Sequence, residues 1–334
     1  MPESNSEHPD TTPGAHDADA AAREATPSAG DAAAASASPS DVETRAGIVT
    51  VAGRPNAGKS TLLNRLVGEK LSIISAKPQS TRDRVVGIVS DATTQMIVLD
   101  TPGLMDPAYE LQQAMRGAAI SAVRDADVII YVADGTAGAP PPFAKAIGPR
   151  TEITVPIITV LNKMDLVNAR ERDRMMGAIP DAVAISARTG EGMLDLFARV
   201  RALLPVSPFL YPADEISTQP VRFFAAELVR ETALEQLSDE VPYSVACEIE
   251  EFRESQSPVY IRATLFVERD SQKSILIGKD GARIREIGRA SRAKIERFVD
   301  GPVYLDLRVK VLANWRRRPQ AMRRFGYVVP KEER

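Results

Sequence analysis

The stretch Gly53–Ser60, with the sequence GRPNAGKS, constrains this chain more than any other. It follows the apolar run Ile48–Ala52, and the leucines after it have helical spacing. This pattern predicts a strand, a glycine-rich loop and the first turn of a helix. Backbone N–H groups and the positive end of the helix dipole bind phosphate at such a place. We expect Lys59 to contact the β- and γ-phosphates of a nucleotide and Ser60 to bind Mg²⁺.

The composition excludes several classes of protein. The chain of 334 residues is long enough for two domains, and it has 42 basic and 45 acidic residues. Its one cysteine, Cys247, cannot form an internal disulfide, which fits a reducing cytosol. Both histidines, His8 and His16, lie in the N-terminal tail, so the predicted folded part has no histidine for catalysis or metal binding. An apolar run long enough to span a membrane and a signal-peptide pattern are both absent, so we expect an intracellular protein.

Residues 1–44 contain one arginine and nine acidic residues and almost no large apolar side chains. Such a segment buries too little apolar surface to offset its ordering entropy, so we predict a disordered tail. Two interpretations remain for its charge: a solvated extension, or an acidic tail that competes with nucleic acid for a basic surface.

Residues 45–204 alternate β-rich runs with candidate helices, which predicts an α/β fold: a doubly wound, mostly parallel sheet with a hairpin at residues 85–99. Ligands of such sheets collect at the carboxyl ends of the strands. Those ends carry Gly53, Asp100, Asn162 and Ser186. The polar motifs are therefore predicted to share one edge.

The motif Asp100-Thr101-Pro102-Gly103 ends the second strand of the hairpin, 40 residues after Ser60. There Asp100 can support Mg²⁺ and the Gly103 amide can contact the γ-phosphate. Thr81 lies before the hairpin and can add a second hydroxyl ligand that orders its loop. We therefore predict Ser60, Thr81 and Asp100 as the Mg²⁺ site and Lys59, Thr81 and Gly103 as catalytic groups.

Asn162-Lys163-Met164-Asp165 ends a later strand. A carboxylate at Asp165 can accept two hydrogen bonds from guanine, whereas adenine offers no matching donor pair. Asn162 is expected to brace the loop, and the stem of Lys163 to cover the base. Ser186-Ala187-Arg188 then completes the pocket, with the Ala187 amide facing the guanine carbonyl. The sequence thus predicts a guanine nucleotide.

A proline-rich linker, residues 205–222, separates a second domain, residues 223–334. It reads as helix, two strands, two helices and a strand, with Gly278-Lys279-Asp280-Gly281 between the two later helices. Residues 273–334 hold 17 basic and 7 acidic residues, whereas residues 223–270 hold 4 and 11. This asymmetry indicates a phosphate-binding surface on one part of the domain only.

Over residues 45–334 the sequence resembles the Era family of bacterial GTPases, which are related to translation factors. The motifs are GRPNAGKS, KPQSTRDR, DTPG, NKMD, SAR, QKSILIGKDG and VKVLANWR. The resemblance implies a P-loop GTPase domain followed by an α+β type II KH domain. It also implies GTP hydrolysis coupled to binding of the 3′ region of small-subunit ribosomal RNA during subunit maturation, in the cytoplasm and with peripheral membrane association. We expect a monomer that does not bind DNA.

The predicted GTP or GDP contacts are Gly53, Arg54, Pro55, Asn56, Ala57, Gly58, Lys59, Ser60, Thr61, Asp100, Thr101, Pro102, Gly103, Leu104, Asn162, Lys163, Met164, Asp165, Ser186, Ala187 and Arg188. The predicted RNA contacts are Gly278, Lys279, Asp280, Gly281, Arg283, Arg285 and Arg289. In the following helix we expect a buried stripe from Ile284 to Phe298, with Arg292 and Lys294 facing outward. Trp315 is expected to pack the end of the last strand, and Arg316 to Arg318 to reach phosphate.

Some residues depart from the family pattern or refine it. Asp280 weakens phosphate clamping in its loop, and Leu104 stands where Ras-like enzymes have a glutamine that orients water. Slow intrinsic turnover is therefore expected. Asn56 matches an asparagine that binds K⁺ in related GTPases, where K⁺ replaces an arginine finger.

Two alternatives remain open. One is a GTP-gated, non-catalytic scaffold whose basic C-terminal part docks on a protein or an anionic membrane. The other keeps the enzyme but makes transfer RNA its partner.

Overall fold

The computed structural model describes residues 43–75, 77–149 and 151–329. The predicted disordered tail lies outside the described residues apart from its last two positions, Glu43 and Thr44. In the described part of the chain, no helix is both long and apolar enough to cross a membrane.

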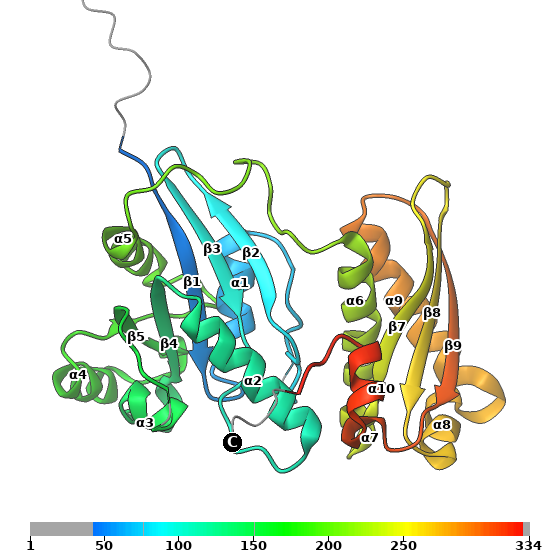
Figure 1. The fold of residues 1–334 in the computed structure, drawn as a ribbon. Coiled ribbons are helices and arrows are strands. Elements are labelled where there is room, and N and C mark those ends of the chain that lie inside the picture. Colours follow the sequence, from blue (N-terminus) through cyan, green and yellow to red (C-terminus); the bar gives the residue numbers. More distant parts are fainter. Residues whose placement is uncertain (1–42, 76, 150, 330–334) are drawn as a thin grey trace, which may run out of the picture. The chain divides into compact units, whose positions relative to one another are not determined.

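Within these residues, six strands form one sheet in the order β2-β3-β1-β4-β5-β6 (Figure 1). The strands are β1 (Arg45–Gly53), β2 (Val85–Ser90), β3 (Thr94–Asp100), β4 (Val128–Asp134), β5 (Ile157–Asn162) and β6 (Val183–Ala184). β2 pairs with β3 antiparallel, and the remaining pairs are parallel. The predicted doubly wound, mostly parallel sheet is confirmed.

Helices follow the strands of this sheet, and we call sheet and helices together the six-stranded half. The helices are α1 (Lys59–Val67), α2 (Glu110–Arg124), α3 (Phe143–Ile147), α4 (Ala169–Ala178) and α5 (Met193–Leu203). α3 was not predicted from the sequence, because five residues between prolines and glycine are too short to show a helical period.

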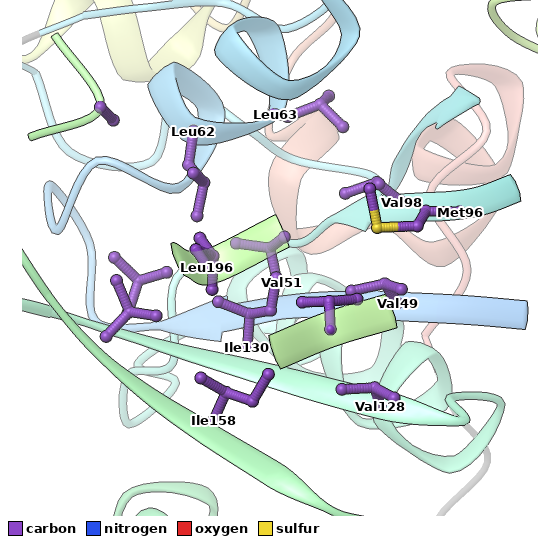
Figure 2. Close-up of a cluster of buried hydrophobic side chains, with 14 of the residues drawn as sticks. Val49, Val51, Leu62, Leu63, Met96, Val98, Val128, Ile130, Ile158 and Leu196 are labelled. Atoms are coloured by element: carbon purple, nitrogen blue, oxygen red, sulfur yellow. The ribbon is translucent and has the colours of Figure 1, made fainter. Parts of the chain in front are cut away.

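Two apolar cores cover the faces of the six-stranded sheet. Figure 2 shows one of them, in which Leu62 and Leu63 of α1 and Leu196 of α5 pack on strand residues. In the other core, side chains of α2 and α3 pack on the opposite face of the same strands. β1 is largely buried, as expected for a strand with helices over both faces. It is therefore a rigid base for the loop that follows it.

The register of the sheet brings the predicted motifs to one edge. Val51 pairs with Asp100 across β1 and β3, and Asp134 pairs with Asn162 across β4 and β5. Gly53 lies two residues beyond Val51 at the end of β1. The carboxyl ends of the four central strands are thus level, because their hydrogen-bonded pairing fixes where each ends.

The rest of the described chain, from Val221 onward, contains a second sheet in the order β7-β8-β9, and we call it the three-stranded half. Its strands are β7 (Ala246–Arg253), β8 (Val259–Val267) and β9 (Val303–Val311). β7 and β8 are antiparallel, whereas β8 and β9 are parallel. The helices are α6 (Val221–Gln236), α7 (Val241–Ser244), α8 (Asp270–Ile277), α9 (Ala282–Phe298) and α10 (Pro319–Arg324). The element order matches the type II arrangement expected.

Several details of the second half differ from expectation. α6 begins at Val221, inside the segment predicted as linker, because Pro220 occupies its N-cap and fixes the chain direction there. α7 and α10 were not predicted. Lys294 does not face outward, since its ammonium bonds to Glu231 at 2.9 Å and to Glu235 at 2.7 Å. Trp315 is fully buried, as expected for a packing residue.

Candidate active site and nucleic-acid interface

The predicted phosphate loop runs from Gly53 at the end of β1 to Lys59 at the start of α1. Gly58 is the N-cap of α1 and has a left-handed φ of 95°. A Cβ there would lie 2.2 Å from the side-chain nitrogen of Asn162, so only glycine fits without displacing that residue. Gly103 is similarly confined, since a Cβ would lie 2.6 Å from Pro55. The glycines thus let three segments approach closely.

The three predicted metal ligands lie together beside this loop. The Ser60 hydroxyl donates to Asp100 Oδ2 at 2.7 Å, and it lies 2.9 Å from Thr81 Oγ1. Thr81 Oγ1 also donates to Asp100 Oδ2, at 3.3 Å. The other carboxylate oxygen, Oδ1, is buried without a hydrogen-bond partner among the described residues. Mg²⁺ prefers oxygen ligands, so this cluster fits the ion that the sequence predicts.

The charges of Lys59 and Asp100 depend on each other. Burial raises the pKa of Asp100, and the ammonium of Lys59 opposes that rise. Burial lowers the pKa of Lys59, and the carboxylate of Asp100 opposes that fall. The Lys59 ammonium donates to the Arg54 carbonyl at 3.1 Å. Phosphate beside Lys59 and a cation beside Asp100 would favour the charged form of each.

A cavity of about 340 Å³ opens at this place. Predicted residues that line it include Pro55, Asn56, Gly58, Lys59, Ser60, Thr61, Thr81, Gly103 and Lys163. Sequence reasoning missed Ile73, Ile74, Ser75, Gln79 and Ser80, which also line it. All five lie in the segment between α1 and β2 that also contains Thr81. That shared location is the sequence signal that could have identified them.

The DTPG segment is held tightly behind the phosphate loop. The buried Thr101 hydroxyl donates to the Val51 carbonyl at 2.8 Å, and the Leu104 amide donates to the Gly53 carbonyl at 2.9 Å. Pro102 and Gly103 are buried as well. The Leu104 side chain is buried in the core against α2 and α3, so it can contribute no polar group to a reaction.

The predicted base-recognition residues meet beyond the phosphate loop. Asn162 donates to the Ala57 carbonyl at 2.9 Å and accepts from the Ala187 amide at 3.0 Å, so it braces two loops as expected. Lys163 forms an ion pair with Asp134 at 2.6 Å. Asp134 was not among the predicted site residues, although it also ends a strand. Met164 is buried beneath this loop.

Asp165 is the carboxylate proposed to select the base. The Ser186 hydroxyl and the Arg188 guanidinium hold its pKa below the usual range, so it is ionised at neutral pH. Arg188 pairs with Asp165 Oδ2 at 2.5 Å, and this arginine is largely exposed. A base that pairs with Asp165 would therefore displace the solvent-facing guanidinium of Arg188. Losing such an exposed ion pair costs little free energy.

The predicted RNA-binding loop connects α8 to α9. Gly278 has a φ of 71° and Gly281, the N-cap of α9, has a φ of 74°. A Cβ on Gly278 would lie 2.8 Å from the Cβ of Arg283, so the loop requires glycine there. Lys279 and Asp280 are exposed between the two glycines.

The arginines after this loop are exposed, and some of them already bond to other groups of the protein. Arg283 donates to the Gln236 carbonyl at 2.9 Å, and Arg289 pairs with Glu286 one turn earlier. Arg285 is exposed on the same helix. Arg316, which was expected to reach phosphate, instead pairs with Glu268 at 2.6 Å, because that carboxylate faces it from the end of β8.

A phosphate loop and a GxxG loop on these two sheets define a P-loop nucleotide-binding protein with a KH module. The profile of the family described as "50S ribosome-binding GTPase" matches residues 48–163, and that of the KH domain matches residues 240–316. The chain is 38% identical over 291 residues to GTPase Era of Carboxydothermus hydrogenoformans, covering 85% of this chain and 98% of the relative. It is 41% identical to GTPase Era of Afipia carboxidovorans, covering 86% and 96%.

Solved structures agree with these relatives. A variant of Aquifex aeolicus Era bound to GDP and AlF₄⁻ has a TM-score of 0.78 and 38% identity, covering 85% of this chain and all of that one. A structure of Era with MgGDPNP and nucleotides 1506–1542 of 16S ribosomal RNA has the same TM-score and identity. The chain belongs to the Era family of GTPases. It is therefore a GTPase, which confirms the predicted enzyme class and the family resemblance.

Proposed function

We propose that this GTPase binds the 3′ region of small-subunit ribosomal RNA and acts in maturation of that subunit. The observation that carries this proposal is the pairing, in one chain, of the Ser60–Thr81–Asp100 cluster with the glycine loop at residues 278–281. A related Era protein has been crystallised with MgGDPNP and a segment of 16S ribosomal RNA. The chemistry of the residues here supports the same pair of ligands.

In the phosphate site, Lys59 and the amides of residues 53–60 hold the β- and γ-phosphates. Ser60, Thr81 and Asp100 hold Mg²⁺, which neutralises charge that develops on the phosphate oxygens. The Gly103 amide contacts the γ-phosphate, and its burial keeps that N–H in a fixed position. Arg54, Pro55, Ala57, Thr61, Thr101 and Pro102 shape the loop around these groups.

Turnover is slow by this proposal. Leu104 is buried in an apolar core, so no side chain orients water from that position. Asn56 has a left-handed φ of 61° and lines the cavity, which supports the proposal that it binds K⁺ beside the phosphates. That cation would stand in place of an arginine finger.

Guanine is selected by Asp165, while Asn162 and Ala187 complete the pocket; the Ala187 amide, predicted to face the guanine carbonyl, donates here to Asn162 Oδ1. The two hydrogen bonds of Asn162 tie the base loop to the phosphate loop, so the two parts of the nucleotide site keep a fixed spacing. Lys163, Met164, Ser186 and Arg188 line or support the same pocket. Adenine offers the ionised Asp165 carboxylate no matching pair of donors.

RNA is taken by the glycine loop, with Lys279, Asp280, Arg283, Arg285 and Arg289 beside it. We propose the division into a GTPase domain at residues 45–204, a linker at 205–222 and a KH domain at 223–334. The protein is proposed to be a cytoplasmic monomer that binds no DNA. Exposed arginines of α9, such as Arg285 and Arg292, also support a peripheral contact with anionic membrane.

The experiment that tests this function measures RNA binding at one salt concentration, with the protein loaded with GDP or a non-hydrolysable GTP analogue. The probes are the single-stranded 3′ end of small-subunit RNA and a scrambled RNA. Gly278→Asp should lose the selective binding, because its Cβ would collide with Arg283 and a second acidic group would face phosphate. Gly301→Asp adds the same charge outside the loop, where a Cβ meets nothing closer than 3.7 Å, and should bind like wild type.

Equal affinity for both RNAs in both nucleotide states would contradict the proposal. Binding to vesicles that contain anionic lipid but not to RNA would instead favour the scaffold that docks on a membrane. Preference for transfer RNA over the 3′ probe would keep the enzyme and change its partner.

A further inference from the structure

The segment 77–84, between α1 and β2, is bonded to the three-stranded half at several points. The Lys77 ammonium donates to the carbonyls of Leu234 and Leu237 at the end of α6. The Arg82 guanidinium donates to the Val245 carbonyl at 2.6 Å and to the Tyr243 carbonyl at 3.0 Å. These bonds satisfy carbonyls at the ends of α6 and α7, which have no partner within their own helices. The segment 77–84 of the six-stranded half is thus held in place by helix ends of the three-stranded half.

Arg230 of α6 provides the anchor nearest to the metal cluster. Its guanidinium is almost completely buried, and it donates to the Ser80 carbonyl at 2.5 Å. It also donates twice to the carboxylate of Glu227, at 2.8 and 2.5 Å, so the charge is paired. Because the guanidinium is planar and held by these two hydrogen bonds to Glu227, the second N–H of Nη2 points in a fixed direction, toward the Ser80 carbonyl. The Ser80 carbonyl therefore has a defined position.

Both neighbours of Thr81 in the chain are fixed by bonds to the three-stranded half: Ser80 through Arg230, and Arg82 through its own guanidinium. The Ser80 carbonyl carbon is bonded to the Thr81 amide nitrogen, so fixing that carbonyl fixes the plane of the peptide before Thr81. The buried Arg82 side chain fixes the residue after it. The Thr81 hydroxyl then reaches Ser60 and Asp100 at 2.9 and 3.3 Å.

We propose that Arg230 is a positioning residue for the metal site, and that it holds Thr81 in place through the Ser80 carbonyl. The inference rests on the proposed role of Thr81 as a Mg²⁺ ligand. It extends that role, because a residue of the three-stranded half now determines how well the six-stranded half binds Mg²⁺ with a triphosphate. Arg230 does not contact the cluster itself and is not a catalytic residue.

Coupling of this kind acts in both directions. If α6 favours the bound position of Thr81, then Mg²⁺ with triphosphate favours the observed position of α6 by the same factor. Couplings between two such sites are commonly about 5- to 150-fold in affinity. GDP lacks the γ-phosphate, so its affinity should depend little on Thr81. The effect is therefore specific for the triphosphate.

The test compares the wild-type full chain with a double variant, Arg230→Met with Glu227→Gln. The second substitution removes the carboxylate that would otherwise be left without its arginine partner. Affinities for GDP and for a non-hydrolysable GTP analogue are measured across a Mg²⁺ titration. We expect the variant to lose about 5- to 150-fold in affinity for the analogue and to need more Mg²⁺, with GDP affinity changed less than about twofold. Thermal unfolding shows whether it is folded.

Two further variants make the comparison specific. Arg222→Met removes an arginine from the same helix whose bond, to the Ile249 carbonyl at 2.9 Å, stays within the three-stranded half, so it should leave the analogue-to-GDP ratio unchanged. Arg230→Lys keeps a cation that can still reach Ser80 and should lose less than Arg230→Met. If the double variant does not fold, the lysine variant provides the test.

An unchanged analogue-to-GDP ratio in a folded Arg230 variant would overturn the inference, and so would equal losses for both nucleotides, which would indicate a general structural role. An equal change in the Arg222 variant would overturn it as well. Failure of wild type to show Mg²⁺-dependent binding of the analogue would instead contradict the proposed metal site, and the inference with it.

Discussion

At the scale of single residues, Asp165 decides which base the pocket accepts. Asp165→Asn replaces an acceptor by an amide that matches xanthine better than guanine, so we expect preference to shift from GTP to xanthosine triphosphate. A site that hydrogen-bonds its substrate discriminates by roughly 10⁴. The measurement is the affinity of both nucleotides. Asp173→Asn, at an exposed position of α4, changes the same group away from the site and should keep the wild-type preference. Full GTP selectivity in Asp165→Asn would exclude this assignment.

Single residues also show where sequence reasoning stopped. Asp100 and Asn162 could be placed because each ends a strand, and parallel pairing brings such ends together; Asp165 could be placed because it follows Asn162 closely. The ion pair of Arg188 with Asp165 could not be foreseen, since it depends on how a loop turns after β6. Nor could the bond from Arg230 to Ser80, which joins residues 150 positions apart through packing of two halves.

At the scale of elements, α1 can be tested at both ends because each carries a left-handed glycine. Gly58 has a φ of 95° and Gly68 a φ of 84°. Alanine at either position should cost about 1–2 kcal/mol in free energy of unfolding from backbone strain. A Cβ on Gly68 meets nothing within 4 Å, whereas one on Gly58 meets Asn162 at 2.2 Å. Only Gly58→Ala should therefore also weaken GTP binding.

Urea unfolding and GTP affinity, measured for both alanine variants, separate strain from collision. Gly68→Ala is the control, since it shares the helix and the backbone region but not the collision. Equal GTP affinity in the two variants would show that the close contact between the phosphate loop and Asn162 is unimportant for binding.

Long elements could be predicted from the sequence, whereas three short helices could not. α9 and β9 could be predicted as a helix and a strand because seventeen and nine residues of consistent pattern leave one register that buries Ile287, Ile295 and Val303. α7 has four residues and α3 has five, so neither completes a hydrophobic period. Lys294 was misplaced for another reason: its partners, Glu231 and Glu235, belong to α6, and only tertiary packing brings them near.

At the scale of the whole molecule, a buried cluster connects the two halves. Leu111 and Met115 of α2 pack with Trp315, Met322 and Tyr327, which follow β9. Trp315 is the only tryptophan of the chain, it is fully buried, and its indole N–H donates to the Ser244 carbonyl at 2.7 Å. Its fluorescence therefore reports on this contact rather than on the nucleotide site.

We expect a GTP analogue with Mg²⁺ to raise the midpoint of thermal unfolding followed by Trp315 fluorescence as much as that followed by far-ultraviolet circular dichroism. Ligand at about 100 times its dissociation constant stabilises the folded state by about 2.7 kcal/mol. That stabilisation reaches Trp315 only if the two halves unfold together. We expect them to do so because they share a buried cluster and because Arg82 bonds to α7. Chelating Mg²⁺ should remove the shift in both signals. A fluorescence transition that does not move while the dichroism transition does would mean that the halves unfold independently, so occupancy of the phosphate site would have no means of reaching the glycine loop.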